Sequence, residues 1–362
     1  MHSTQPISVG ILGATGTVGQ RFIQLLENHT FLRIAALGAS ERSAGKTYRE
    51  AASRSWKQSS PIPSAVADLV VLPCKPDHFA ECRIIFSGLD ADVAGEIESH
   101  FQAAQFAVFS NAKNHRMNPL VPLLVPLVNA DHLDVIPHQR AARGLDKGFI
   151  VTNANCSTTG LVVALKPLQD AFGPLARIIV TTMQAISGAG YPGVPSLDIL
   201  GNVVPHIGGE EEKMEAEVAK ILGSVRGDGG GFAPLEGLRV SASCNRVPVV
   251  DGHTESVFIE FERRPAPSVE EVVAVLRAYR PEALTLDVPS APAHAVVVLD
   301  EPDRPQPRMD VLTGGGNSVV VGRVRPCSVF DVKFTLLSHN TILGAAGSSI
   351  MNAEIAVAKG LI

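Results

Sequence analysis

A glycine-rich turn between a short strand and a helix, near the start of the chain, constrains this fold most. Residues 7–12 form an apolar strand pattern, and residues 20–27 have the spacing of an amphipathic helix. Between them lies the run Gly13-Ala-Thr-Gly-Thr-Val-Gly19, and a second strand pattern follows at 32–37. Such a turn lets the backbone approach a pyrophosphate, which binds at the helix N-terminus. The context predicts a dinucleotide-binding βαβ unit, with a turn that serves packing alone as the alternative.

The turn and the first helical residues are the expected cofactor contacts: Gly13, Thr15, Gly16, Thr17 and Val18. The loop after the second strand bears on which dinucleotide binds, because an NAD site usually has an acidic residue there. Four residues of this loop suit a 2′-phosphate instead: Ser40, Arg42, Ser43 and Lys46. They favour NADP, although Glu41 could still serve the ribose of NAD and the cations could belong to a solvated loop.

Strand and helix patterns continue to alternate up to about residue 155. A strand is predicted at 82–88, a helix at 92–101 and another strand at 106–110, whereas the Pro-rich residues 61–76 are expected to be partly loop. Alternating strands and helices imply a parallel, doubly wound sheet of the Rossmann type.

After residue 155 the pattern changes to a mixed α+β half. Helices are predicted at 210–222 and 269–279. The strand-like segments are 177–184, 238–243, 253–261, 295–299, 318–322 and 330–336. Several of these strands are expected to form a face for a dimer. The α/β chain is thus divided into a dinucleotide-binding domain (1–155, completed by a C-terminal helix at 340–362) and a catalytic and dimerisation domain (156–339).

One cysteine, Cys156, lies between an apolar, β-branched run at 149–151 and an apolar helical pattern at 161–168. This order predicts a strand, a tight turn and a helix start. A thiol there faces the unpaired N–H groups and the positive end of the helix dipole, which favour a thiolate. A thiolate on a turn is placed to attack a carbonyl carbon. A buried structural cysteine is the commoner alternative.

Composition narrows the class of protein. The 362 residues carry a net charge of −5 with both signs intermixed, so no nucleic-acid partner is expected. The apolar runs are interrupted, and neither a membrane span nor a signal peptide is expected. The five cysteines have no CxxC spacing. We therefore expect no metal site and a reducing, cytoplasmic location.

Seven motifs, taken in order, make the chain resemble the aspartate-β-semialdehyde dehydrogenases of archaea and fungi. They are GATGTVG at 13–19, SNAKNHR at 110–116, NANCSTTG at 153–160, QAISGAGYPG at 184–193, GGEEEKME at 208–215, RVPVVDGHTE at 246–255 and HNTILGAAGSS at 339–349. The resemblance implies a fold like that of glyceraldehyde-3-phosphate dehydrogenase and a homodimer or homotetramer. It also implies an NADP(H)-dependent, phosphorylating aldehyde dehydrogenase.

That activity interconverts L-4-aspartyl phosphate and L-aspartate 4-semialdehyde, in the pathway to lysine, threonine, methionine and isoleucine. The resemblance makes Cys156 the nucleophile that carries the acyl group as a thioester. It makes His253 the general acid/base, where a surface histidine is the alternative. Gln184 is expected to orient the acyl intermediate, and Asn155 to help hold the oxyanion.

The substrate groups are assigned in the same way. Arg246 is expected to bind the α-carboxylate with its planar fork, and Glu210 the ammonium group. Lys213, three residues further on one helix face, and Arg116 are the candidates for the phosphate, with Asn114 nearby. Glu211 remains an alternative to Glu210. Near the cofactor the resemblance places Ser187, Gly188 and Asn340, the last at the nicotinamide carboxamide.

Two rival functions remain open at this stage. Malonyl-CoA reductase, or a related acyl reductase on this fold, would need the same cysteine and histidine but has no substrate ammonium to bind. A non-enzymatic NADP-binding protein is the second rival. The joint presence of Cys156, His253, Arg246 and Lys213 argues against it.

Overall fold

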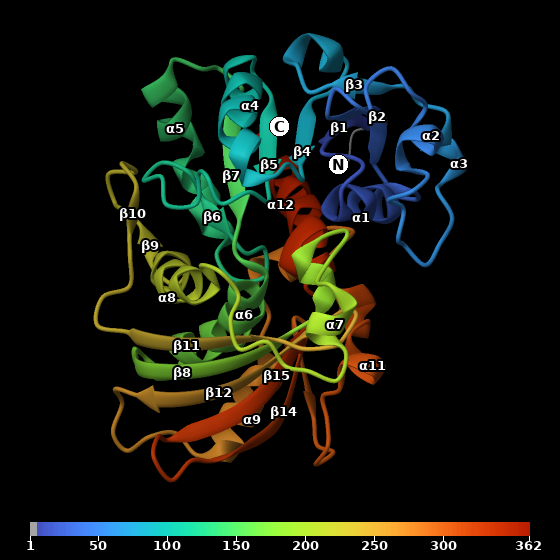
Figure 1. Cartoon of the computed structure of the whole chain (residues 1–362). Helices are drawn as coiled ribbons and strands as arrows, with labels where there is room; N and C mark the ends of the chain where they lie inside the picture. Colours follow the sequence, from blue (N-terminus) through green and yellow to red (C-terminus); the bar gives the residue numbers. More distant parts are fainter. Residues whose placement is uncertain (1–5) are drawn as a thin grey trace.

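The computed structural model describes residues 6–362 and begins with the predicted βαβ unit (Figure 1). Strand β1 (Ile7–Leu12) leads through the glycine turn into α1 (Thr17–Leu26), and β2 (Leu32–Ala39) then pairs parallel with β1. Apolar residues of α1 such as Phe22 and Ile23 are fully buried, because they lie on the face that packs against the sheet. The prediction for this unit is confirmed.

The first sheet has seven parallel strands in the order β3-β2-β1-β4-β5-β7-β6. The added strands are β3 (Val71–Pro73), β4 (Ile84–Ser87), β5 (Ala107–Ser110), β6 (Leu123–Leu124) and β7 (Phe149–Asn153). The chain reverses its direction of growth between β1 and β4. In a doubly wound sheet, ligands bind outside the carboxyl ends of the strands at this reversal.

Short helices and turns connect the strands of this half. They are α2 (Tyr48–Ala52), α3 (Ser64–Ala67), η1 (Pro76–Phe79), α4 (Ala91–Ala103), η2 (Ala130–Val135) and α5 (Ile136–Arg143). The Pro-rich residues 61–76 contain α3 and β3 as well as loop. The predicted helix at 92–101 and strand at 106–110 correspond to α4 and β5.

The second sheet has six strands in the order β11-β8-β12-β15-β14-β13. The strands are β8 (Leu175–Gln184), β11 (Arg239–Arg246), β12 (His253–Phe261), β13 (Val296–Leu299), β14 (Val319–Pro326) and β15 (Val332–Ser338). Helices α6 (Cys156–Phe172), α8 (Glu210–Ile221) and α9 (Val269–Ala278) contact this sheet. Residues of β12 are alternately buried and half-buried, because successive side chains point to opposite faces.

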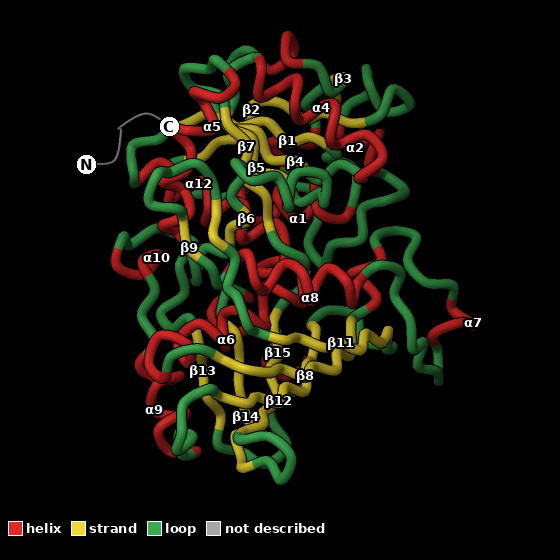
Figure 2. Tube along the Cα trace, turned by 90° about the vertical axis from the view of Figure 1, so that its left-hand side faces the viewer, coloured by secondary structure: helices red, strands yellow, loops and turns green. Residues whose placement is uncertain are grey.

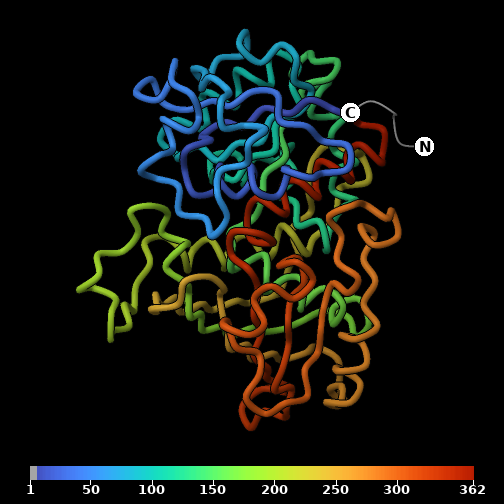
Figure 3. The backbone as a smooth tube through the Cα atoms, turned by 90° about the vertical axis from the view of Figure 1, so that its right-hand side faces the viewer, coloured from blue at the N-terminus to red at the C-terminus, as the bar shows by residue number. Residues whose placement is uncertain are grey.

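The remaining elements are short. They are η3 (Ile186–Ala189), α7 (Ser196–Ile199), β9 (Ser224–Val225), β10 (Phe232–Ala233), α10 (Glu282–Thr285), α11 (Pro307–Asp310) and η4 (Thr313–Gly316). The loop that carries α7 projects from the body of the molecule in both side views (Figures 2 and 3). Leu197 and Leu200 are exposed on it.

The chain ends in the π-helical turn η5 (Ile342–Ala346) and helix α12 (Gly347–Ala358). Helix α12 packs against α1 and against strands β4, β5 and β7 of the first sheet. Residues Gly347 to Ala356 are all buried. In Figure 1 this red segment lies between the two sheets. Across residues 6–362 there is no helix with the length and apolar character that a membrane crossing requires.

Candidate functional site

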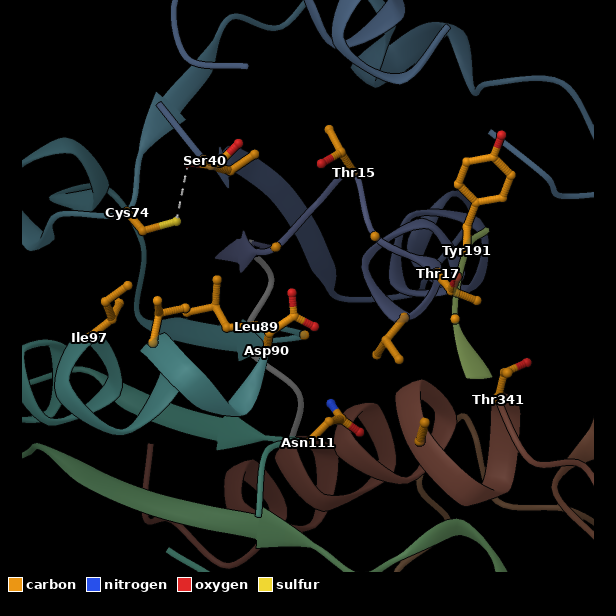
Figure 4. A pocket seen from close by; sticks show the side chains of 18 of the residues that line it. Thr15, Thr17, Ser40, Cys74, Leu89, Asp90, Ile97, Asn111, Tyr191 and Thr341 are labelled. Carbon is orange, nitrogen blue, oxygen red and sulfur yellow. Dashed lines mark hydrogen bonds between the residues drawn. The ribbon is translucent and has the colours of Figure 1, made fainter. Parts of the chain in front are cut away.

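A cavity of about 1130 Å³ opens at the carboxyl ends of the first sheet, where the two halves meet. Figure 4 shows Thr15 and Ser40 on one side of this cavity and Asn111 and Thr341 on the other. The predicted cofactor residues that line it are Gly13, Thr15, Gly16, Thr17, Val18, Ser40, Arg42, Ser187, Gly188 and Asn340. Asn155 and Cys156 line the same cavity.

The glycine turn is shaped for close approach to a bound group. Gly13 has a φ of +72°, and a Cβ there would lie 2.6 Å from the carbonyl oxygen of Gly88. Gly16 is the N-cap of α1 and offers no side chain to the free N–H groups of the first turn. These groups remain available to a pyrophosphate, so the residues present fit a dinucleotide.

Cationic groups lie at the end of the cavity next to β2. Arg42 and Ser40 line it, and so does Lys75, from the segment after β3. Sequence reasoning missed Lys75, because only the sheet order places β3 beside β2. Ser43 and Lys46 are not among the residues of this wall. Glu41 lines the cavity as well, and so do the acidic residues Asp90 and Glu96.

Cys156 is the first residue of α6, directly after the turn that follows β7. The Asn155 side-chain oxygen caps the helix by accepting from the N–H groups of Ser157 and Thr158, at 3.0 and 3.2 Å. Gly344 of η5 packs against the cysteine, and a Cβ at Gly344 would lie 2.8 Å from that of Cys156. The local order predicted from the sequence is confirmed.

His253, the first residue of β12, lies beside the thiol. Its Nε2 is 3.2 Å from Sγ of Cys156, and its Nδ1 accepts a hydrogen bond of 3.1 Å from the N–H of Ala185. Because Nδ1 is the acceptor, the neutral ring carries its proton on Nε2. The histidine is fully buried, not a surface residue at a strand start.

The electrostatics of this pair differ from the sequence expectation of a thiolate. Burial and the charge of Glu210 raise the pKa of the Cys156 thiol to about 12, against the opposing effect of Arg246 and Arg116. Burial and Arg246 lower the pKa of His253 to about 3. Both groups are therefore neutral at rest, because desolvation outweighs the helix dipole.

Arg246 ends β11 and is 7% exposed. One terminal nitrogen, Nη1, donates to the Ala185 carbonyl at 2.8 Å. A Cβ on Gly188 would lie 2.9 Å from this nitrogen, so glycine leaves the guanidinium its space. Gln184 pairs with Arg246 in the sheet, is buried, and donates from Nε2 to the Thr182 hydroxyl at 3.2 Å.

Helix α8 brings Glu210 and Lys213 to the same site, where they form an ion pair of 3.1 Å. Glu210 also accepts from the side-chain amide of Asn155 at 2.6 Å. Glu211 instead accepts from the N–H of Cys244 on β11, at 2.9 Å. The structure therefore places Glu210, and not Glu211, beside the residue that precedes the nucleophile.

Arg116 lines the cavity and forms an ion pair of 2.8 Å with Glu217. Its neighbour in the motif, Asn114, donates to the Ala91 carbonyl at 2.9 Å and is not part of the cavity wall. Glu217 was not singled out from the sequence. Its role depends on a fold that brings it to Arg116 across 101 residues.

Asn340 connects three parts of the site. Its Nδ2 donates to the Ser187 hydroxyl at 2.8 Å, and its Oδ1 accepts from the N–H of Gly252 at 2.9 Å. It thereby joins the turn η3 to the residue just before His253. Asn111 and Thr341 also line the cavity. They lie within the motifs at 110–116 and 339–349 but were not singled out from the sequence.

Comparison with known families finds two adjoining matches. Residues 8–136 match the semialdehyde dehydrogenase NAD binding domain, and residues 165–343 match the semialdehyde dehydrogenase dimerisation domain. Aspartate-semialdehyde dehydrogenase of Cryptococcus neoformans is 61% identical and covers 100% of both chains. The enzymes of Saccharomyces cerevisiae (51% identical, 98% of both chains) and Archaeoglobus fulgidus (48%, covering 98% of this chain and 99% of the relative) are also similar.

Two solved structures share the fold over nearly the whole chain. Aspartate semialdehyde dehydrogenase with NADP from Candida albicans has a TM-score of 0.92 at 52% identity, covering 99% of this chain and 100% of that one. Aspartate semialdehyde dehydrogenase II from Vibrio cholerae, complexed with ASA, has a TM-score of 0.76 at 26% identity, covering 98% and 99%.

Proposed function

The chain belongs to the aspartate-semialdehyde dehydrogenase family, and we propose that its reaction proceeds through a thioester on Cys156. The reaction is the NADP-dependent, reversible reductive dephosphorylation of L-4-aspartyl phosphate to L-aspartate 4-semialdehyde. The observation that carries the proposal is the contact of 3.2 Å between His253 Nε2 and the Sγ of Cys156, which lines the cofactor cavity. A nucleophile with an adjacent acid/base group is what covalent acyl transfer requires.

In the oxidative direction Cys156 Sγ adds to the aldehyde carbon. The sulfur loses the thiol proton and the carbonyl oxygen gains a proton, which gives a hemithioacetal. The hemithioacetal then loses this proton and a hydride and becomes the thioester. A phosphate oxygen attacks the acyl carbon, the S–C bond breaks, and the acyl phosphate leaves while the sulfur of Cys156 takes its proton back from His253. NADP, when bound, supplies the hydride acceptor, and NADPH the hydride in the biosynthetic direction.

His253 moves the protons of these steps at Nε2, the ring atom next to sulfur. As sulfur adds, Nε2 gives its proton to the developing oxygen and takes the thiol proton in exchange. Nδ1 accepts from the Ala185 N–H throughout. Because burial lowers the pKa of His253 to about 3, the imidazolium is transient and the ring returns its proton readily.

The substrate is bound by groups of opposite charge around the thiol. Arg246 binds the α-carboxylate, and Glu210 the ammonium group. Lys213 and Arg116 bind the phosphate. Asn155 donates to the oxyanion, and Gln184 orients the acyl group. One such oxyanion donor is worth about 3 kcal/mol in other enzymes.

NADP binds along the glycine turn, with its 2′-phosphate near Arg42, Ser40 and Lys75. The Candida albicans relative, 52% identical, was solved with NADP, which supports this choice. Asn340 and Ser187 hold the nicotinamide end. We assign residues 1–155 with 340–362 to cofactor binding, and 156–339 to catalysis and dimerisation.

The chain is proposed to act as a homodimer or homotetramer, and the match to a dimerisation domain over residues 165–343 supports self-association. The half-buried face of the second sheet, which includes the exposed Ile179, is the candidate surface. All five cysteines are free thiols, which supports a reducing, cytoplasmic setting.

Malonyl-CoA reductase is not favoured. A relative of 61% identity over the full chain is an aspartate-semialdehyde dehydrogenase. Glu210, placed between Asn155 and Lys213, gives the site an anion for a substrate ammonium group, which malonyl-CoA does not have.

The decisive test is a spectrophotometric assay of NADP reduction by aspartate semialdehyde, with and without phosphate and repeated with NAD. We expect phosphate-dependent formation of NADPH and a slower reaction with NAD. Cys156→Ala should abolish turnover and retain NADP binding, measured by calorimetry, whereas Cys327→Ala, far from the cavity, should be active. Turnover by Cys156→Ala, or reduction of malonyl-CoA in preference to aspartyl phosphate, would contradict the proposal.

A further inference from the structure

Helix α8 carries a repeated pattern whose second half has no assigned role. Glu210 and Lys213 form one Glu-x-x-Lys pair, and Glu217 and Lys220 form another seven residues later. Seven residues are about two helical turns, so both pairs lie on one face of the helix. The first pair reaches the substrate site. Glu217 and Lys220 are only 3% and 4% exposed and lie behind it.

The Glu217 carboxylate bridges two residues of the cavity wall. Its Oε1 accepts from Nη1 of Arg116 at 2.8 Å, and its Oε2 accepts from the main-chain N–H of Asn155 at 2.7 Å. Arg116 is the candidate phosphate ligand, and Asn155 directly precedes the nucleophile. One carboxylate therefore sets the relative position of the phosphate-binding group and the catalytic turn.

Lys220 secures the main chain of the same segment. Its ammonium donates to the carbonyl oxygens of Arg116, Asn118 and Val121, at 2.6, 2.8 and 2.9 Å. Arg116 is thus held by its side chain through Glu217 and by its main chain through Lys220. Burying an ammonium group costs desolvation energy, which the three carbonyl acceptors of Lys220 offset.

The bridge uses only part of the hydrogen-bonding capacity of Arg116, which also lines the cavity. Of its five N–H donors, one is used by Glu217 and one by the Asn111 carbonyl, at 3.0 Å. Its Nε is buried and has no hydrogen-bond partner within residues 6–362, so the donors that can meet an anion are those left on the terminal nitrogens. The negative charge of Glu217 weakens the attraction of Arg116 for an anion, so the ion pair does not serve to strengthen anion binding through charge. The ion pair instead fixes the orientation of the guanidinium.

We propose that Glu217 is a positioning residue that aligns Arg116 with the catalytic turn at Asn155, so that phosphate meets the acyl carbon on Cys156 in attacking geometry. The inference rests on the proposed function, in which Arg116 binds phosphate. A misplaced ligand of this kind weakens productive binding of phosphate and slows its attack, and it leaves binding of the aldehyde nearly unchanged.

The test measures KM for phosphate and KM for aspartate semialdehyde separately, in the intact enzyme. Glu217→Gln keeps the shape but accepts well from only one partner, and we expect KM for phosphate to rise about tenfold, the effect of one lost charged hydrogen bond. KM for aspartate semialdehyde should change less than about threefold, since Arg246 and Glu210 are untouched. The exposed Glu212→Gln on the same helix is the matched control and should behave as the parent.

A double-mutant cycle shows whether Glu217 acts through Arg116. The effects of Glu217→Gln and Arg116→Lys on KM for phosphate should be clearly less than additive in the double variant. If Glu217→Gln does not fold, judged by circular dichroism, Glu217→Asp supplies the same comparison, because its shorter carboxylate cannot span both partners.

The outcomes separate the two proposals. A parent enzyme without phosphate-dependent NADP reduction, or an Arg116→Lys variant with unchanged KM for phosphate, overturns the assignment of Arg116. If instead the parent needs phosphate and Arg116→Lys raises KM for phosphate, the assignment of Arg116 stands. The inference about Glu217 then fails, and Glu217 is purely structural, if Glu217→Gln leaves KM for phosphate unchanged, changes both KM values equally, or combines additively with Arg116→Lys.

Discussion

The main-chain N–H of Ala185 donates a hydrogen bond to Nδ1 of His253 across 3.1 Å. This contact places the ring proton on Nε2, which faces Cys156 Sγ at 3.2 Å. The same contact disfavours the protonated, positively charged ring. That form carries a proton on Nδ1 as well, and this proton would point at the proton of the Ala185 N–H. A single backbone group therefore decides which nitrogen of the acid/base residue carries the proton in the free enzyme.

Nitrogen NMR of isotope-labelled histidine should show His253 as the neutral Nε2–H form from about pH 5 to 8, since its pKa is lowered to about 3. Ala185→Pro removes the donor at a backbone φ of −64° that proline adopts, and the preference for this form should disappear. A His253 signal that titrates near its ordinary pKa would contradict this electrostatic picture.

Arg246→Lys should weaken binding of aspartate semialdehyde strongly. A lysine ammonium cannot replace the planar fork of an arginine, even with the charge retained. We expect KM for aspartate semialdehyde to rise at least about tenfold, with KM for phosphate little changed. Initial-rate kinetics check this, and an unchanged KM for the aldehyde would remove Arg246 from the substrate site.

Glu210→Gln should have opposite effects on thiol reactivity and on turnover. The Glu210 charge contributes to the raised pKa of Cys156, so its removal lowers that pKa and increases the thiolate fraction. Alkylation of Cys156 by iodoacetamide should be faster below about pH 9, while KM for aspartate semialdehyde rises because the ammonium loses its partner. Glu212→Gln is the control. Slower alkylation in Glu210→Gln would contradict the prediction.

The buried carboxyl group of Glu255 makes the folding stability of the protein depend on pH. It is fully buried on β12, and neither carboxylate oxygen has a hydrogen-bond partner within residues 6–362. Burial and the charge of Glu210 raise its pKa well above 4.5. The folded protein holds this proton after the unfolded chain has released it. This contribution to stability is complete below about pH 4.5 and is lost as pH rises toward the folded pKa, by about 1.4 kcal/mol per unit.

Glu255→Gln keeps the shape and removes the ionisation. Denaturant unfolding of the two proteins over a pH series should show that the variant gains stability relative to the parent as pH rises above about 4.5. A constant difference across the series would show that Glu255 is already ionised in the folded state.

Lys75→Ala and Arg42→Ala should each reduce the preference for NADP over NAD. Both side chains line the cofactor cavity beyond β2, where a 2′-phosphate adds charge that only NADP has. We expect kcat/KM for NADP to fall about tenfold and that for NAD to change little. Lys46→Ala, off the cavity wall, is the control, and equal losses for both cofactors would contradict this placement.

The sequence by itself determined the local features. The strand, the glycine turn and the helix at 7–26 depend on neighbours in the chain, and so does the position of Cys156 at a strand-to-helix junction. Periodicity also identified β12, which begins at His253 as expected. The order of the seven motifs then identified the family, because it combines a cysteine nucleophile, a histidine acid/base and a carboxylate-binding arginine in the order typical of that family.

Only the tertiary structure decided what depends on distance and burial. It showed that Glu210, and not Glu211, contacts Asn155, and that Asn114 lies outside the cavity wall. It also brought Lys75 to the cofactor wall and Glu217 to Arg116. It reversed the expected charge state of Cys156 as well. A helix dipole can be inferred from a sequence, but the desolvation that outweighs it depends on how residues far apart in the chain exclude water.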